Sequence, residues 1–140
     1  MIKFNKNFFE NNEILFFGAT KKYKMFCNSA YKALSGRGIK IYPLCDEADI
    51  FSFKVYKDFN ELPVIPKTAY TILDTDDNRK IINQLKERGI KRILFHSKRI
   101  IDQDILDRCA ELGIETAIAC PLMIYGSALH RVHGFFAGVR

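Results

Sequence analysis

A short apolar run that ends at a glycine limits the fold more than any other feature of the sequence. Ile14 to Phe17 are continuously apolar, which is typical of a strand that is covered on both faces of a parallel sheet. Gly18-Ala19-Thr20 follows at once, and basic residues come next. In a parallel α/β protein, a turn between a strand and a helix presents backbone N–H groups that can hold a phosphate. The stretch therefore predicts a phosphate-binding loop at the start of an α/β sheet.

Strand-like and helix-like segments alternate along the rest of the chain. After the first strand, the pattern predicts strands at 39–44, 54–56, 68–74, 92–95 and 115–119. Helices are predicted to begin at the capping residues Asn28, Asp77 and Asp102. Gly38, Gly89 and Gly113 each separate a helix from the next strand, as expected of helix C-caps. The predicted fold class is α/β, a Rossmann-like three-layer domain with a mostly parallel five- to six-stranded sheet and right-handed crossovers.

Length and composition indicate one globular domain. The 140 residues are 48% hydrophobic and 27% charged, which fits a single domain over 1–140 with 1–12 and 125–140 as peripheral extensions. The segment 1–12 is predicted to form a short leading helix. No run approaches the ~20 apolar residues of a membrane span, and no signal-peptide pattern is present. We therefore expect a cytoplasmic protein with no membrane partner.

Cysteine spacing and charge exclude several classes of site. The four cysteines form no Cys-x-x-Cys pair, so neither a zinc ribbon nor a redox dithiol is expected. The net charge of +6 favours anionic partners, but the basic residues are spread along the chain without a nucleic-acid-binding motif. We expect a phosphorylated small molecule rather than nucleic acid. His130 and His133 lack a third ligand nearby, so no metal site is predicted.

The order of the motifs resembles the small stand-alone CoA-binding proteins, whose single domain is similar to the CoA-binding domain of the succinyl-CoA synthetase α subunit. The resemblance covers about residues 13–126. It is carried by the Gly18-Ala19-Thr20 strand end, Tyr42-Pro43, the segment from Val55 to Pro63, the helix that ends in Lys86-Glu87-Arg88-Gly89, and Cys120-Pro121.

The resemblance implies a nucleotide ligand and where it lies. CoA or an acyl-CoA would place its pyrophosphate on the Gly18–Thr20 loop and its adenosine near the loop after Tyr42-Pro43. Three departures stand out, namely Cys45-Asp46 for the family's Asn-Pro, Thr75-Asp76-Asp77 for its basic residue, and Phe95-His96-Ser97 for its glutamine-containing strand end. The candidate cofactor-binding residues are Gly18, Ala19, Thr20, Lys21, Lys22, Lys24, Cys45, Asp46, Thr75 and His96.

Other functions stay open at this stage. The chain has no Gly-x-Gly-x-x-Gly and no P-loop motif, yet Asp46 follows the second strand where a carboxylate binds the ribose in NAD proteins. A small NAD(P)-dependent or acyl-transfer enzyme using His96 and Asp76 is one alternative, and a module acting through protein contacts of 125–140, as a homodimer or with a partner, is another. No catalytic residue is predicted, and the leading hypothesis is a non-catalytic CoA-binding module.

Two side chains have a structural interpretation beside the functional one. Cys27 lies near three lysines before a predicted helix, where a lowered thiol pKa would allow a mixed disulfide with CoA. The favoured interpretation is a small buried residue in helix–sheet packing. His96 could bond a ligand, but a strand-end histidine bonded to the backbone is favoured.

Overall fold

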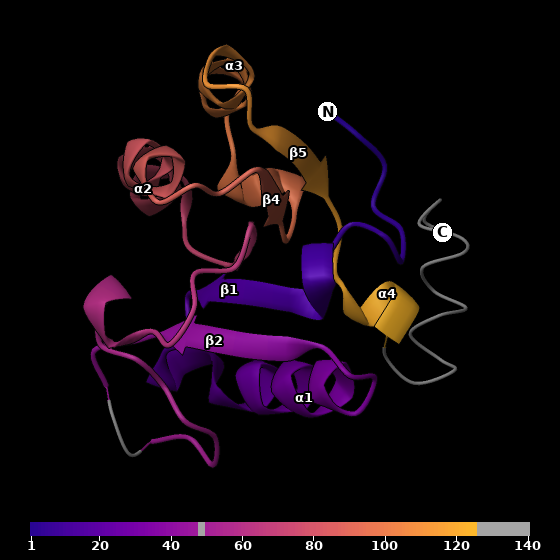
Figure 1. Cartoon of the computed structure of the whole chain (residues 1–140), viewed down its shortest axis with the longest axis vertical. Coiled ribbons are helices and arrows are strands. Elements are labelled where there is room, and N and C mark those ends of the chain that lie inside the picture. Colours follow the sequence, from indigo (N-terminus) through magenta and orange to yellow (C-terminus); the bar gives the residue numbers. More distant parts are fainter. Residues whose placement is uncertain (48–49, 126–140) are drawn as a thin grey trace.

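A computed structural model of the chain describes residues 1–47 and 50–125. Five strands form one parallel sheet in the order β2-β1-β3-β4-β5 (Figure 1). This confirms the predicted α/β Rossmann-like fold class. The strands are β1 Glu13–Phe17, β2 Lys40–Leu44, β3 Thr68–Thr71, β4 Arg92–Phe95 and β5 Glu115–Ile118.

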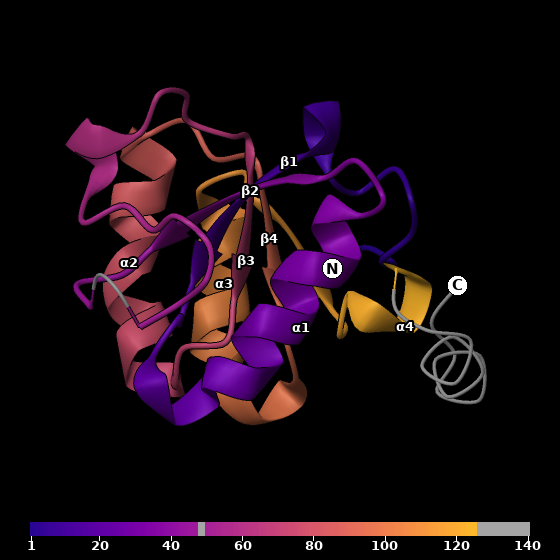
Figure 2. The ribbon, with the colours of Figure 1, turned by 90° about the horizontal axis from the view of Figure 1, so that it is seen from below.

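Helices cover both faces of the sheet and give it three layers. Helix α1 (Lys24–Ser35) lies on one face, and α2 (Thr75–Glu87) and α3 (Gln103–Glu111) lie on the other (Figure 2). The short helix α4 (Leu122–Tyr125) contacts α1. Each face buries its own apolar cluster, with Phe16 and Leu34 in the α1 cluster and Leu15 and Ile82 in the other. Alternate residues of one strand thus serve both cores, which explains why β1 is continuously apolar from Ile14 to Phe17.

The chain reverses its direction of travel across the sheet at β1. Leu15 pairs with Tyr42 of β2 on one side and with Ala69 of β3 on the other. The connection from β1 to β2 therefore runs to one side, and the next connection crosses to the opposite side. In open α/β sheets, ligands bind at the carboxyl ends of the strands that flank such a reversal. That position is the end of β1 and β3.

The start of α1 differs from the prediction. A 3-10 turn at Lys21–Tyr23 leads directly into α1 at Lys24, so the helix begins four residues before the expected cap Asn28. Lysine and methionine have good helix propensity, and nothing in Lys24-Met25-Phe26 forces the chain out of the helix. Lys21 and Lys22 therefore lie in this turn, and Lys24 is the first residue of α1.

The strand predicted at 54–56 is wrong. Only Tyr56 makes a β-bridge, to Leu44, with its N–H donating to the Pro43 carbonyl at 2.8 Å and its carbonyl accepting from Cys45 N–H at 2.9 Å. Because Pro43 has no N–H to donate on this outer edge of β2, the pairing does not extend into a ladder.

The segment 1–12 does not form the predicted leading helix. It contains one 3-10 turn at Glu10–Asn12, where Asn11 and Asn12 have positive φ values of 58° and 54° that an α-helix does not allow. Three phenylalanines of this segment are nonetheless buried in the α1 cluster, and Phe9 stacks on Tyr125 at 5.8 Å between ring centroids. The segment is thus part of the core.

The remaining boundaries are close to those predicted. Asp74 caps α2 by accepting from the Asp77 N–H at 2.9 Å, so α2 starts just before the expected cap. Gly38, Gly89 and Gly113 have positive φ, as C-cap glycines require. No helix within the described ranges is long and apolar enough to cross a membrane. The C-terminal contact segment expected at 125–140, with His130 and His133, lies outside the described residues beyond Tyr125.

Candidate functional site

Gly18 directly follows β1 and packs against Ile72, which directly follows β3. Its φ is +108°, and a Cβ placed there would collide with Cγ1 of Ile72 and lie 3.2 Å from the Ile72 carbonyl carbon. Only glycine fits both the backbone conformation and this close approach. The loop after β1 therefore packs directly on the loop after β3, at the reversal of the sheet.

An open cleft of about 320 Å³ lies at this junction. One wall comes from the loop after β1 and the other from the loops after β3 and β4. The cleft is lined by Gly18, Thr20, Lys22, Tyr23, Ile72, Leu73, Asp74, Asp77 and Ile100. Three of the predicted cofactor-binding residues, Gly18, Thr20 and Lys22, are thus brought together.

Asn78 does not line the cleft itself, but its side chain bonds to two of the residues that do. This fully buried residue accepts a hydrogen bond from the Thr71 hydroxyl at 2.7 Å. Its amide nitrogen donates to the carbonyls of Leu73 and Ile100, both at 2.9 Å. One side chain therefore ties the loops after β3 and β4 to each other. Asn78 was not predicted from the sequence, although it shares the buried face of α2 with Ile82 and Leu85 at helical spacing. A polar residue on such a face is a signal of a buried hydrogen-bonding role.

The two walls of the cleft carry opposite charges. Lys21, Lys22 and Lys24 are exposed on the β1 side, and the Lys22 ammonium lies 5.2 Å from the centre of the Tyr23 ring. Asp74 and Asp77 stand on the opposite wall, where Asp74 caps α2. An anionic group is therefore stabilised on the lysine side and repelled on the α2 side.

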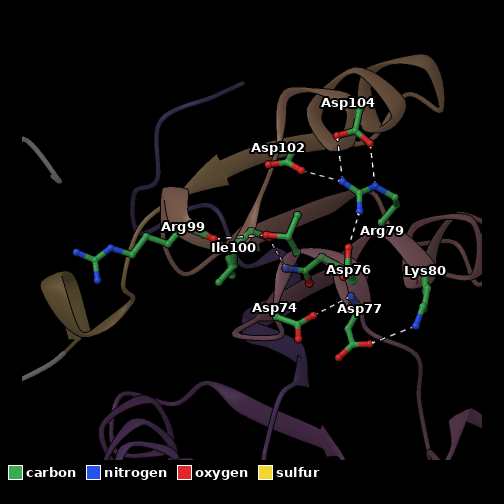
Figure 3. A network of polar contacts seen from close by, with 11 residues as sticks. Asp74, Asp76, Asp77, Arg79, Lys80, Arg99, Ile100, Asp102 and Asp104 are labelled. Atoms are coloured by element: carbon green, nitrogen blue, oxygen red, sulfur yellow. Dashed lines mark hydrogen bonds and ion pairs between the residues drawn. The ribbon is translucent and has the colours of Figure 1, made fainter.

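Asp76 is already paired with a cation. The Arg79 guanidinium lies between three carboxylates, at 2.9 Å from Asp76, 2.8 Å from Asp102 and 2.9 Å from Asp104 (Figure 3). This bridge links α2 to the start of α3, and Arg79 holds the pKa of Asp104 below its usual value. Asp76 is therefore engaged outside the cleft lining.

The other predicted residues border the cleft or lie away from it. Ala19 is buried, and the Thr75 hydroxyl donates to the Arg99 carbonyl at 3.4 Å. Cys45 and the exposed Asp46 follow β2 and do not line the cleft. The Cys45 sulfur accepts from the Glu47 N–H at 3.3 Å, and burial raises its pKa.

His96 has a side-chain partner that was not predicted from the sequence. Its Nδ1 lies 2.7 Å from the hydroxyl of Tyr70, and Phe26 of α1 packs edge-on against its ring at 5.1 Å between centroids. The expected side-chain bond to the backbone is therefore wrong. Burial lowers the pKa of His96 and raises that of Tyr70, so both side chains are neutral near pH 7. His96 contacts α1 through Phe26 and does not line the cleft.

Cys27 is fully buried in the packing between α1 and the sheet. Burial raises its pKa, and the Thr20 N–H offsets this effect only in part. The lowered thiol pKa considered from the sequence is therefore wrong. All four cysteines are free. Within 1–47 and 50–125, no group of three or more metal-ligating side chains comes together.

Comparisons with known proteins agree with this architecture. The model of a family described as a CoA binding domain matches residues 12–126. No curated protein matches the sequence. A solved structure of an uncharacterized protein has a TM-score of 0.65 at 20% identity, over 81% of this chain and 93% of that one.

Two further solved structures have the same fold. A conserved hypothetical protein from Pyrococcus furiosus has a TM-score of 0.65 at 19% identity, over 86% of this chain and 97% of that one. A dinucleotide-forming acetyl-coenzyme A synthetase from Candidatus Korarchaeum cryptofilum, in complex with phosphate and ADP, has a TM-score of 0.61 at 18% identity. That match covers 77% of this chain and 25% of the synthetase. At these identities the likeness establishes a shared fold.

Proposed function

Because this chain belongs to the family of CoA-binding domains, we propose that it binds CoA or an acyl-CoA in the cleft between the ends of β1 and β3. The observation that carries the proposal is that the contact of Gly18 with Ile72 lies at a cleft lined by Gly18, Thr20 and Lys22 of the β1 loop. The reversal of the sheet at the same place is where folds of this class bind nucleotides.

The pyrophosphate lies on the β1 side of the cleft. There it meets the Thr20 hydroxyl and the N–H groups of Lys21 and Lys22, which have no acceptor within the Lys21–Tyr23 turn. Lysine is suited to this role as a mobile point charge that adjusts to the phosphate. The carboxylates of Asp74 and Asp77 keep the phosphates on the lysine wall, because like charges repel.

The adenosine extends from the β1 loop toward the loop after β2, which carries Cys45 and Asp46. The pantetheine arm then extends the other way, over the ends of β3 and β4, since β1 lies between β2 and β3 in the sheet. No nucleophile with an adjacent base lines the cleft within the described ranges. We therefore propose a module that holds the ligand and does not transform it.

Isothermal titration calorimetry with CoA, acetyl-CoA, NAD, NADP and ATP tests the proposal. CoA and acetyl-CoA should bind, and Lys22→Ala should weaken their binding by about ten- to a hundredfold, as loss of one charge-assisted contact predicts. Lys32→Ala is the matched control, because Lys32 is an exposed lysine at the far end of α1. Binding of NAD or NADP without CoA would favour the dinucleotide enzyme instead.

A further inference from the structure

Tyr70 and His96 form a polar pair that the proposed cleft does not use. The Tyr70 hydroxyl and His96 Nδ1 are 2.7 Å apart, and they come from neighbouring strands whose ends lie at the same edge of the sheet. Tyr70 is fully buried and stacks on Phe16, with ring centroids 5.3 Å apart and an interplanar angle of 15°. Its hydroxyl therefore has a fixed position.

The direction of this hydrogen bond follows from the burial of Tyr70. His96 is the only hydrogen-bond partner of the Tyr70 hydroxyl in the described part of the chain. If Nδ1 carried the proton and donated it, the phenolic O–H would be buried without an acceptor, which is costly. If Tyr70 donates to Nδ1, both groups are satisfied. Tyr70 is thus the donor, and the single proton of the neutral imidazole resides on Nε2.

The Nε2–H group has no partner among residues 1–47 and 50–125. No hydrogen bond involves Nε2 within residues 1–47 and 50–125, and Nε2 is not among the buried polar atoms there that lack a partner. Because Phe26 packs against the ring and Tyr70 holds Nδ1, the ring cannot turn freely. The result is an N–H donor of fixed direction that donates to no acceptor in the described part of the chain.

The backbone places this donor beside the cleft. His96 directly follows β4, and its N–H donates to the carbonyl of Thr71 at 3.1 Å. Thr71 ends β3 immediately before Ile72, which lines the cleft. On the α1 side, Phe26 contacts His96 and lies one helical turn from Tyr23 on the cleft wall. His96 thus borders the part of the edge that the pantetheine arm crosses.

We infer that Tyr70 is a positioning residue that fixes His96 as a neutral Nε2–H donor to an uncharged carbonyl oxygen of the pantetheine arm. The identity of the ligand rests on the proposed function, whereas the tautomer of His96 does not depend on it. A neutral imidazole suits an amide or thioester oxygen, because it donates a hydrogen bond without carrying a positive charge. A positively charged imidazolium would bind a phosphate in preference to an uncharged oxygen. Tyr70 and His96 thereby add recognition of the arm to recognition of the phosphates.

Nitrogen-15 NMR of the histidine side chains in the free protein tests the tautomer. In the wild type, His96 should have an unprotonated Nδ1 and a protonated Nε2, and Tyr70→Phe should convert it to a mixture of both tautomers. Tyr31→Phe is the control, because Tyr31 is a partly buried tyrosine that stacks on Phe53 instead. A protonated Nδ1 in the wild type would overturn the inference.

Calorimetry with dephospho-CoA and ADP tests the ligand, since these two compounds differ by the pantetheine arm. His96→Phe keeps an aromatic ring and should weaken dephospho-CoA by about three- to tenfold, as expected of one neutral hydrogen bond, while leaving ADP unchanged. His96→Gln, which retains an N–H donor, should recover part of the loss. Equal effects on both compounds, or none on dephospho-CoA, would refute this role. If the wild type binds neither of these compounds nor CoA, the proposed function fails together with the role in the arm, and the NMR result still decides the tautomer.

Discussion

Gly18 and Ile72 touch across the reversal of the sheet so closely that a β-carbon on Gly18 would overlap the Ile72 side chain. This contact defines the cleft, because it fixes the distance between the loops after β1 and β3. It also makes Gly18 a residue whose substitution affects stability as well as binding.

Gly18→Ala should destabilise the protein by about 2–4 kcal/mol, the sum of a left-handed backbone strain and a steric clash. Chemical denaturation measures this change in the free energy of unfolding. Gly38→Ala is the control, since Gly38 also has a positive φ of +82° but a β-carbon added there would meet no atom within 4 Å. Gly38→Ala should cost only about 1 kcal/mol, from the backbone term alone. Equal losses in the free energy of unfolding for both variants would mean that Ile72 moves aside without cost.

Asn78→Ala should destabilise the protein by about 2–4 kcal/mol, because it removes the acceptor of the Thr71 hydroxyl proton and the donor to the carbonyls of Leu73 and Ile100. The same denaturation experiment on Asn83→Ala provides the comparison. Asn83 is exposed on the same helix and accepts hydrogen bonds from Arg108, so its loss should stay below about 1 kcal/mol. A small effect at Asn78 would contradict its role as a brace between the loops.

Acid should destabilise the protein through His96. Its pKa in the folded state lies below the ordinary value of 6.5 because of burial, so the unfolded chain binds the proton more readily. The free energy of unfolding contributed by this group is therefore fully present above pH 6.5 and falls as the pH drops below it. The slope for one proton is at most about 1.4 kcal/mol per pH unit. His96→Gln should flatten the pH dependence of unfolding between pH 6.5 and 5, and an unchanged profile would show that His96 is readily protonated in the folded protein.

Asn28→Ala should stabilise the protein by about 0.5–1 kcal/mol. The Asn28 Oδ1 is buried without a hydrogen-bond partner in the described part of the chain, and asparagine has poor propensity within a helix such as α1. Thermal unfolding of the variant checks this. A lower melting temperature would mean that Oδ1 is satisfied by water or by a group outside the described residues.

The five strands of the sheet could be predicted from the sequence because they are short runs of apolar and β-branched residues bounded by turn residues. Helices α1, α2 and α3 are also followed by a glycine with positive φ, which is a local requirement. These signals depend only on neighbouring residues. The sequence could also place Gly18, Thr20 and Lys22 in one loop, since all three follow the same strand closely.

The missed features depend on contacts between distant segments. In the sequence Tyr70 is one of several apolar strand residues, and only the pairing of β3 with β4 brings it to His96, 26 positions away. In the sequence Asn78 is one of several polar residues of α2, and only the packing of α2 on the sheet shows that it is buried. The start of α1 was missed because the capping preference of Asn28 was weighed above the helix propensity of the residues before it. The pairing at Tyr56 is limited to a single bridge because Pro43 has no N–H to donate.

The most direct test of CoA binding at the cleft is an NMR titration of the backbone amides with CoA. We expect the amide signals of Gly18, Thr20, Lys22 and Leu73 to shift as CoA is added, while those of Gly38, Gly89 and Gly113 at the opposite edge of the sheet stay unchanged. Shifts confined to the opposite edge, or no shifts even at millimolar CoA, would contradict binding at the cleft.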